Sequence, residues 1–170
     1  SESLFEKPVK QINDSNISIK HFQVSRAYKR LLKYSNKYIK IFKTTNINTV
    51  PITKQDQKVI AIFDDLLFTK FDEVLKLYPP LDKDIVQQRF GNTAIRSFHD
   101  HLNNDEVIDN ILQDFLLQLH QLNPVDGQTL HILKKSTIVT KHYLMKAFGT
   151  RDRMDYVTGT ELSFLAFLIC

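Results

Sequence analysis

Apolar residues recur at intervals of three and four positions through most of this chain, which is the spacing of one face of an α-helix. The pattern runs over residues 21–42, 53–78, 104–122 and 129–148. No segment shows a strand pattern that competes with it. With 4 glycines among 170 residues, the chain also lacks the turn residues that an all-β protein needs. The sequence therefore predicts an all-α fold, and its length fits one domain over residues 1–170.

Capping residues and prolines mark the expected helix ends. We expect Ser18, Thr53 and Asn104 to be N-caps, because such side chains accept hydrogen bonds from first-turn amides. Pro79 and Pro80 end the second helix. A short helix is expected over 92–102, and the helix from Thr129 to Phe148 is either continuous or broken in two at the β-branched residues 137–140. Residues 1–17 and 149–160 are expected to be irregular, and the last apolar run opens at Glu161. Because that run continues to the final residue, we expect the domain to be truncated inside a helix.

Positive charge is concentrated in the first 50 residues, which hold ten lysines and arginines against three acidic residues. The helix over 21–42 is basic along one face. That face is either solvated or a docking surface for an acidic protein or nucleic acid. No aromatic residues interleave the charges on that face, which disfavours nucleic acid as a partner. The basic residues are Arg26, Lys29, Arg30, Lys33, Lys37 and Lys40.

Several kinds of site are not supported by the sequence. His99 and His101 are two positions apart and so do not share a helix face, and Cys170 is the only cysteine, which excludes a thiolate zinc cluster. We therefore expect no metal site. Neither a glycine-rich nucleotide loop nor a nucleophile elbow is present. No run of about 20 apolar residues predicts a membrane span. With one thiol and no signal-peptide pattern, we expect the protein in the cytoplasm or nucleus.

Two segments carry chemistry in positions expected to be loops. The first is residues 88–96, where Gly91 can adopt a positive φ, Asn92 can cap the next helix, and Arg89 and Arg96 lie seven positions apart. The second is residues 148–161, which places arginines, aspartates and hydroxyls beside a helix start. Helix N-termini and arginines both favour phosphate. Each segment is also explained by a well-capped, solvated helix start.

These segments resemble the two signature motifs of the phosphotyrosyl phosphatase activator family, the type 2A phosphatase activators. In the first, Arg89, Phe90, Gly91, Asn92, Ala94 and Arg96 match. In the second, the matching residues are Phe148, Gly149, Arg153, Met154, Asp155, Tyr156, Thr158, Gly159, Glu161, Leu162 and Phe164. Two positions depart from the motif: Val157 replaces a glycine and Thr160 replaces a histidine. The resemblance covers nearly the whole chain and corresponds to the N-terminal half of the family's proteins.

The resemblance implies a multi-helix fold with a core, a linker and a lid. It implies an activator of the type 2A phosphatase catalytic subunit, with peptidyl-prolyl cis-trans isomerase activity. It also implies a pocket for ATP with magnesium, in which Arg153, Thr158, Gly159 and Thr160 contact phosphate. If the replaced glycine has a positive φ, Val157 distorts this loop and weakens ATP binding. Surface contacts or loop support are expected from Arg89, Gly91, Asn92, Arg96, Asp155, Tyr156 and Glu161. The alternative is a non-catalytic helical adaptor of the same fold that docks an acidic protein.

Overall fold

The computed structural model describes residues 6, 8–10, 12–13, 15–44, 46, 49–81, 92–152 and 158–169. Within those ranges the chain is helical, with no strand, which confirms the all-α prediction. None of the described helices is long and apolar enough to cross a membrane. The elements in chain order are α1 (Asn16–Val24), α2 (Arg26–Thr44), α3 (Lys54–Asp64), the π-helix η2 (Asp65–Lys70), α4 (Phe71–Lys76), α5 (Ala94–Leu102), α6 (Asp105–Leu122), α7 (Gly127–Ala147) and α8 (Thr158–Ile169).

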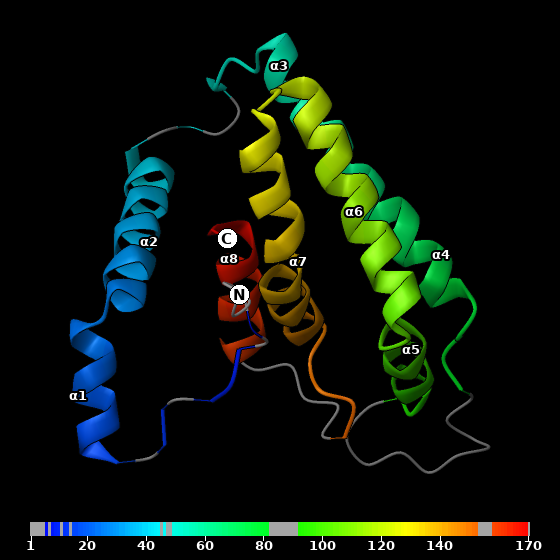
Figure 1. Cartoon of the computed structure of the whole chain (residues 1–170), viewed down its shortest axis with the longest axis horizontal. Coiled ribbons are helices and arrows are strands. Elements are labelled where there is room, and N and C mark those ends of the chain that lie inside the picture. The colour runs from blue at the N-terminus through cyan, green and yellow to red at the C-terminus, as the bar shows by residue number, and fades with distance from the viewer. Residues whose placement is uncertain are drawn as a thin grey trace.

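The helices form a packed body with one helical arm beside it (Figure 1). In the body, α6 packs against α3 on one side and α7 on the other, and α7 packs along α8. The helix α5 bridges α4 and α6 at the lower end of the body as drawn. The arm consists of α1 and α2, and α2 contacts the body at α8.

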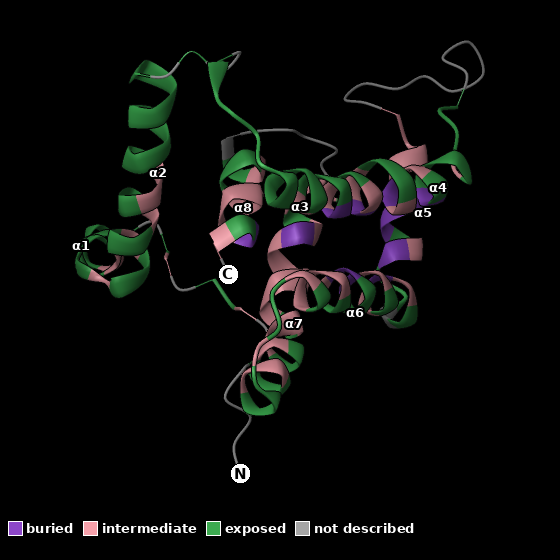
Figure 2. Cartoon of the chain, turned by 90° about the horizontal axis from the view of Figure 1, so that it is seen from above, coloured by how far each residue is buried: buried purple, intermediate pink, exposed green. Residues whose placement is uncertain are grey.

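The core lies where the body helices face one another, whereas α1 and α2 contribute no buried residue (Figure 2). Aromatic rings join its parts: Phe63 on α3 packs edge-to-face on Phe115 of α6, with ring centroids 5.0 Å apart. Phe167 on α8 lies 6.2 Å from the same Phe115 ring. The buried apolar residues are Ile62, Leu66, Phe71, Val74, Phe98, Leu102, Ile108, Leu112, Phe115, Leu144 and Phe167.

The N-terminal arm differs from the single helix predicted over 21–42. The first helix starts earlier, because Ser15 rather than Ser18 is its N-cap and accepts from the Ser18 amide. The chain then breaks at Ser25, which is extended (ψ 157°). The Ser25 hydroxyl accepts from the Tyr28 amide, so it caps the start of α2. Serine competes with helical backbone through such local hydrogen bonds, which the apolar spacing alone does not reveal.

The helix predicted over 53–78 is present but contains a π-turn. Thr53 caps it as predicted, in a capping box with Asp56. At η2 the Phe71 amide donates to the Leu66 carbonyl, five residues earlier. Because a π-turn takes about one residue more than an α-turn, it lets residues five apart face the same side. Both Leu66 and Phe71 are buried in the core as a result.

The later helices correct one predicted start, settle whether the helix after it is broken, and agree with one predicted cap position. Asp126 rather than Thr129 sets the start of α7, through a hydrogen bond from the Thr129 amide. That helix is unbroken through 137–140, where Thr137 and Thr140 hydroxyls donate to backbone carbonyls of the preceding turn. Asn104 occupies the N-cap position of α6, as predicted, but without a side-chain hydrogen bond.

The last apolar run forms α8 and is partly packed against the body. It begins at Thr158, three residues before the predicted Glu161, so residues 158–160 are helical and not irregular. Phe167 is buried in the core, whereas Leu162 and Leu168 on the same helix are exposed. The helix therefore presents one apolar face to α7 and another to solvent.

Candidate partner-binding site

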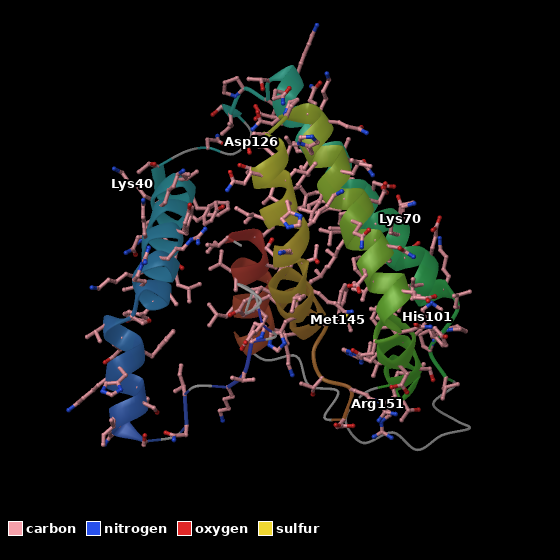
Figure 3. The ribbon with its side chains drawn as sticks, in the orientation of Figure 1. Lys40, Lys70, His101, Asp126, Met145 and Arg151 are labelled. Atoms are coloured by element: carbon pink, nitrogen blue, oxygen red, sulfur yellow. The ribbon has the colours of Figure 1, made fainter. Side chains whose placement is uncertain are left out.

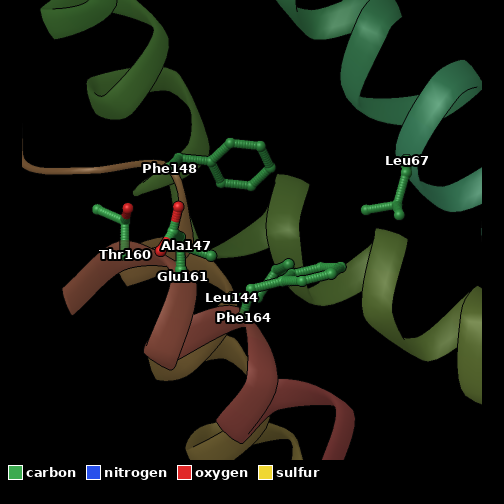
Figure 4. A pocket seen from close by; sticks show the side chains of 7 residues that line it. All are labelled: Leu67, Leu144, Ala147, Phe148, Thr160, Glu161 and Phe164. Atoms are coloured by element: carbon green, nitrogen blue, oxygen red, sulfur yellow. The ribbon is translucent and has the colours of Figure 1, made fainter. Parts of the chain in front are cut away.

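An apolar pocket of about 290 Å³ lies where η2, the end of α7 and the start of α8 meet (Figure 4). Leu67 reaches it from η2, opposite Leu144 and Phe164. Thr160 and Glu161, in the first turn of α8, supply its polar edge. The complete lining is Leu67, Leu144, Ala147, Phe148, Thr160, Glu161 and Phe164.

The end of α7 gives the pocket one of its walls. Gly149 follows the helix with φ 86°, a left-handed conformation that glycine adopts without a Cβ penalty and that commonly ends helices. Its amide donates to the Lys146 carbonyl. Phe148, just before it, packs against Phe71 and Phe98, with ring centroids 4.8 Å and 5.5 Å away. The ring is thus held between α4 and α5 while it lines the pocket.

The helix α5 holds the chain that follows this wall. The buried His99 ring places Nε2 3.4 Å from the Phe148 carbonyl oxygen. Burial lowers the pKa of His99, so the ring is neutral near pH 7. Next to it, Asp100 receives two hydrogen bonds from the Arg151 guanidinium. These bonds lower the pKa of Asp100 and raise that of Arg151.

The residues predicted to contact phosphate are only partly described. Thr158, Gly159 and Thr160 are the first three residues of α8, so their amides belong to the helix N-terminus. Thr160 faces the pocket, whereas Gly159 is exposed. Three further members of the second segment, Arg153, Asp155 and Tyr156, lie outside the described residues, as does Val157.

The first segment leads into α5. Asn92 accepts from the Ala94 amide and also forms two hydrogen bonds with the backbone of Leu81, so it supports the start of α5 and ties it to the segment that follows α4. Arg96 is exposed on α5. Arg89 and Gly91 lie outside the described residues. The structure therefore brings the two segments together through α5, whose start belongs to the first and whose end contacts the second.

The pocket suits a small apolar group. Its volume is at the lower end of the range for ligand sites, which fits one or two side chains rather than a whole nucleotide. The Glu161 carboxylate at its edge disfavours a polyphosphate inside it. Among the residues that the structure describes, no group of three or more histidine, cysteine or carboxylate side chains could hold a metal ion.

Sequence reasoning missed most of the pocket. It singled out Thr160 and Glu161 by their place in the second segment but not the ring of Phe148 or Phe164. Both phenylalanines match the family motif, so the signal was present, but helical spacing assigns aromatic residues to the core. Leu67 could not be found this way, because it reaches the pocket through the π-turn.

Comparison with protein families gives one match over nearly the full chain. A family model described as "Phosphotyrosyl phosphate activator (PTPA) protein" matches residues 8–170. Among curated proteins, a serine/threonine-protein phosphatase 2A activator 1 of Eremothecium gossypii is 28% identical over 97% of this chain and 39% of its own length. The activator of Drosophila melanogaster is 31% identical over 95% of this chain and 34% of its own. The chain thus spans about two fifths of the length of such relatives.

A solved structure agrees with the sequence matches. The crystal structure of the PP2A phosphatase activator Ypa1 PTPA1 superposes with a TM-score of 0.72 and 25% identity. The superposition covers 99% of this chain and 47% of that one. The similarity in fold therefore extends over the arm and the body alike.

Proposed function

The chain belongs to the phosphotyrosyl phosphatase activator family, and from that membership we propose that it binds and activates the catalytic subunit of a type 2A serine/threonine phosphatase. The family match over residues 8–170 carries this proposal. The pocket supports it, since Phe148, Glu161 and Phe164 come from the second signature segment. We assign the pocket and the adjoining first turn of α8 as the partner-binding site.

Co-purification with the catalytic subunit tests this assignment. Glu161 is exposed at the pocket edge, so Glu161→Lys should weaken binding about tenfold or more by placing the wrong charge in the interface. Glu106→Lys is the matched control, because it makes the same exchange in the exposed first turn of α6. Equal loss in both variants, or none in either, would place the interface elsewhere.

The finer proposal is peptidyl-prolyl cis-trans isomerase activity in the same pocket. Isomerisation rotates an amide and forms no covalent intermediate, so it requires a shaped apolar surface and an oriented polar group rather than a catalytic triad. The pocket offers Phe148 and Phe164 as apolar walls and Thr160 as a hydroxyl. The measurement is cis–trans exchange of a Xaa-Pro peptide by NMR. Exchange should accelerate with this chain and slow again in Phe164→Ala, and an unchanged rate with the parent protein would reject isomerase activity.

We also propose weak binding of ATP with magnesium at the first turn of α8. The amides of Thr158, Gly159 and Thr160 belong to a helix N-terminus, which favours phosphate. A valine in place of a glycine that needs a positive φ costs about 1–3 kcal/mol, and about 1.4 kcal/mol is already tenfold in affinity. Val157→Gly with Thr160→His should therefore tighten binding in a calorimetric titration. If the parent binds as tightly as the double variant, this strain argument fails.

An adaptor for an acidic protein is the second candidate, and a specific groove favours it. Between α2, α7 and α8 lies a cavity of about 560 Å³ with Arg26, Lys29 and Arg30 in its lining and no carboxylate. The whole of α2 contains seven basic residues and no acidic one. The same cavity lining includes Leu31, Tyr143 and Ile169, so an acidic amphipathic helix would find both charge and apolar surface here.

A synthetic helical peptide of glutamate and leucine can probe this groove. Affinity should fall with salt and fall further in Arg26→Glu with Lys29→Glu. The control variant is Lys54→Glu with Lys58→Glu, which changes net charge equally on the exposed face of α3. If both variants lose affinity equally, attraction is only to net charge and the groove is not a docking site.

From the proposed type 2A phosphatase partner we further propose that the protein acts in the cytoplasm or nucleus. Fractionation of cells that express it with a fluorescent tag would test this placement. Recovery in a membrane or secreted fraction would contradict it.

A further inference from the structure

Two adjacent residues on α5 contact the chain just after α7, which lies about 50 positions away in sequence. His99 contacts the Phe148 carbonyl, and Asp100 contacts the Arg151 side chain. In Figure 3, Arg151 lies below α5, on the segment that runs down from the end of α7. A third residue of the helix, His101, faces the other way and pairs with Tyr78 at the end of α4 (Oη to Nδ1, 2.9 Å). The end of α5 is therefore anchored on both sides.

The contact with Arg151 is a fork rather than a single ion pair. The Arg151 Nε donates to Asp100 Oδ1 at 2.6 Å and Nη2 donates to Oδ2 at 2.9 Å. Two parallel hydrogen bonds fix the plane of the guanidinium as well as its distance. The carboxylate of Asp152 accepts a third hydrogen bond, from Arg151 Nη1, at 3.2 Å. The Arg151 guanidinium thus donates to two carboxylates, which orients the turn that follows Gly149.

The contact with Phe148 is made by a buried residue. His99 is 4% exposed, and its Nε2 lies 3.4 Å from the carbonyl oxygen of Phe148, the residue that follows α7. A neutral imidazole with its proton on Nε2 donates there. The ring of the same Phe148 packs on Phe98, the neighbour of His99. Backbone and side chain of Phe148 are therefore both held by α5.

We propose that His99 and Asp100 are positioning residues for the apolar pocket, which hold Phe148–Asp152 against α5 and thereby fix the wall that Phe148 supplies. We call the contacts of His99 with Phe148 and of Asp100 with Arg151 the clamp. Because α5 begins in the first signature segment, the clamp joins the two segments into one structural unit. The clamp deepens the proposed function by naming residues that act on the partner site without lining it. The contacts of His99 and Asp100 with the segment after α7 do not depend on whether the phosphatase is the partner.

The first experiment measures amide hydrogen exchange at Phe148 and Gly149, whose amides donate to carbonyls of the last turn of α7. Asp100→Asn keeps the shape of the side chain and removes its charge, so both amides should exchange about two- to fivefold faster, as expected for an exposed ion pair. The charge-swapped pair D100R/R151D should restore protection. Asp109→Asn is the control, because it removes a comparable ion pair between α6 and α7, with Lys141, and should leave both amides unchanged.

The second experiment measures affinity for the type 2A catalytic subunit in the same variants. Asp100→Asn should bind more weakly, with D100R/R151D recovering, while the melting temperature of all variants stays within about 3 °C. His99→Phe should act like Asp100→Asn, and His99→Gln, which can still donate to the Phe148 carbonyl, should recover part of the loss.

The outcomes separate the clamp from the proposed function. Unchanged exchange at Phe148 and Gly149 in Asp100→Asn, or no recovery in the swapped pair, overturns the clamp. If Asp100→Asn speeds exchange at these amides but leaves the affinity for the catalytic subunit unchanged, the clamp does not position the partner site and the proposal is overturned. If the parent chain does not bind the subunit at all, the proposed function fails, and the exchange ratio alone then decides whether the clamp exists.

Discussion

Truncation of Leu112 is the sharpest test of the core, because α6 carries its own control. Leu112 is 1% exposed and Leu117, five residues later on the same helix, is 46% exposed. Leu112→Ala loses the free energy gained by burying the larger side chain and leaves a cavity in the core. Together these two effects lower the free energy of unfolding by about 3–4 kcal/mol. Leu117→Ala removes a side chain that is already half in water, so it costs about 1 kcal/mol. The gain in helix propensity is the same in both and cancels.

Urea unfolding followed by far-ultraviolet circular dichroism measures this difference. The free energy of unfolding of Leu112→Ala should lie about 2–3 kcal/mol below that of Leu117→Ala, with equal m-values. For a chain of 170 residues the melting temperatures should differ by about 4–12 °C. If the two free energies agree within about 0.5 kcal/mol, the face of α6 assigned to the core is wrong and so is the packing of α3 and α7 on it.

Three further predictions follow from local geometry. Thr53→Ala removes the cap of α3 and should lower the free energy of unfolding by about 1 kcal/mol in the same assay. Gly149→Ala forces a Cβ into a left-handed conformation and should cost about 1–2 kcal/mol, whereas Gly127→Ala, where a Cβ meets nothing within 4 Å, should be neutral or stabilising. Burial holds the pKa of His99 below its ordinary 6.5, so as the pH falls the imidazole binds a proton in the unfolded chain before it does so in the folded one. The free energy of unfolding, measured by urea unfolding at several pH values, should therefore fall as the pH drops below about 6.5, and this fall should be smaller in His99→Gln.

The periodicity of apolar residues predicted the long helices of the body well, because those helices bury one face each. The capping threonine placed the start of the second helix correctly at Thr53, whereas α4 ends at Lys76, two residues before the predicted limit at residue 78. The periodicity failed where backbone geometry changes without a change of spacing. The break at Ser25 and the π-turn over Asp65–Lys70 leave the apolar pattern continuous, so only tertiary packing distinguishes them from straight helix.

The arm shows a second limit of the same reasoning. The apolar spacing over 21–42 predicted an amphipathic helix, and two residues of its apolar face, Ile39 and Phe42, are exposed. Amphipathic spacing specifies that a face can be buried, not that a partner within the chain covers it. The helix is present as predicted, and its packing is what the sequence did not specify.

The candidate site was located by motif rather than by physics. The second segment led to Thr160 and Glu161, which do line the pocket. The clamp between Asp100 and Arg151 was not foreseen, because the two residues are far apart in sequence and an exposed ion pair has no periodic signature. Such a contact becomes visible only when the fold brings the end of α7 beside α5.

Activation of a purified type 2A catalytic subunit tests the central claim most directly. The chain is added in increasing amounts to inactive catalytic subunit with magnesium and ATP, and phosphatase activity on a phosphopeptide is measured. Activity should rise to saturation. Glu106→Lys should follow the parent protein, and Glu161→Lys should require about tenfold more protein for the same effect. A flat response to the parent protein, with the subunit shown to respond to a full-length activator, would contradict the central claim.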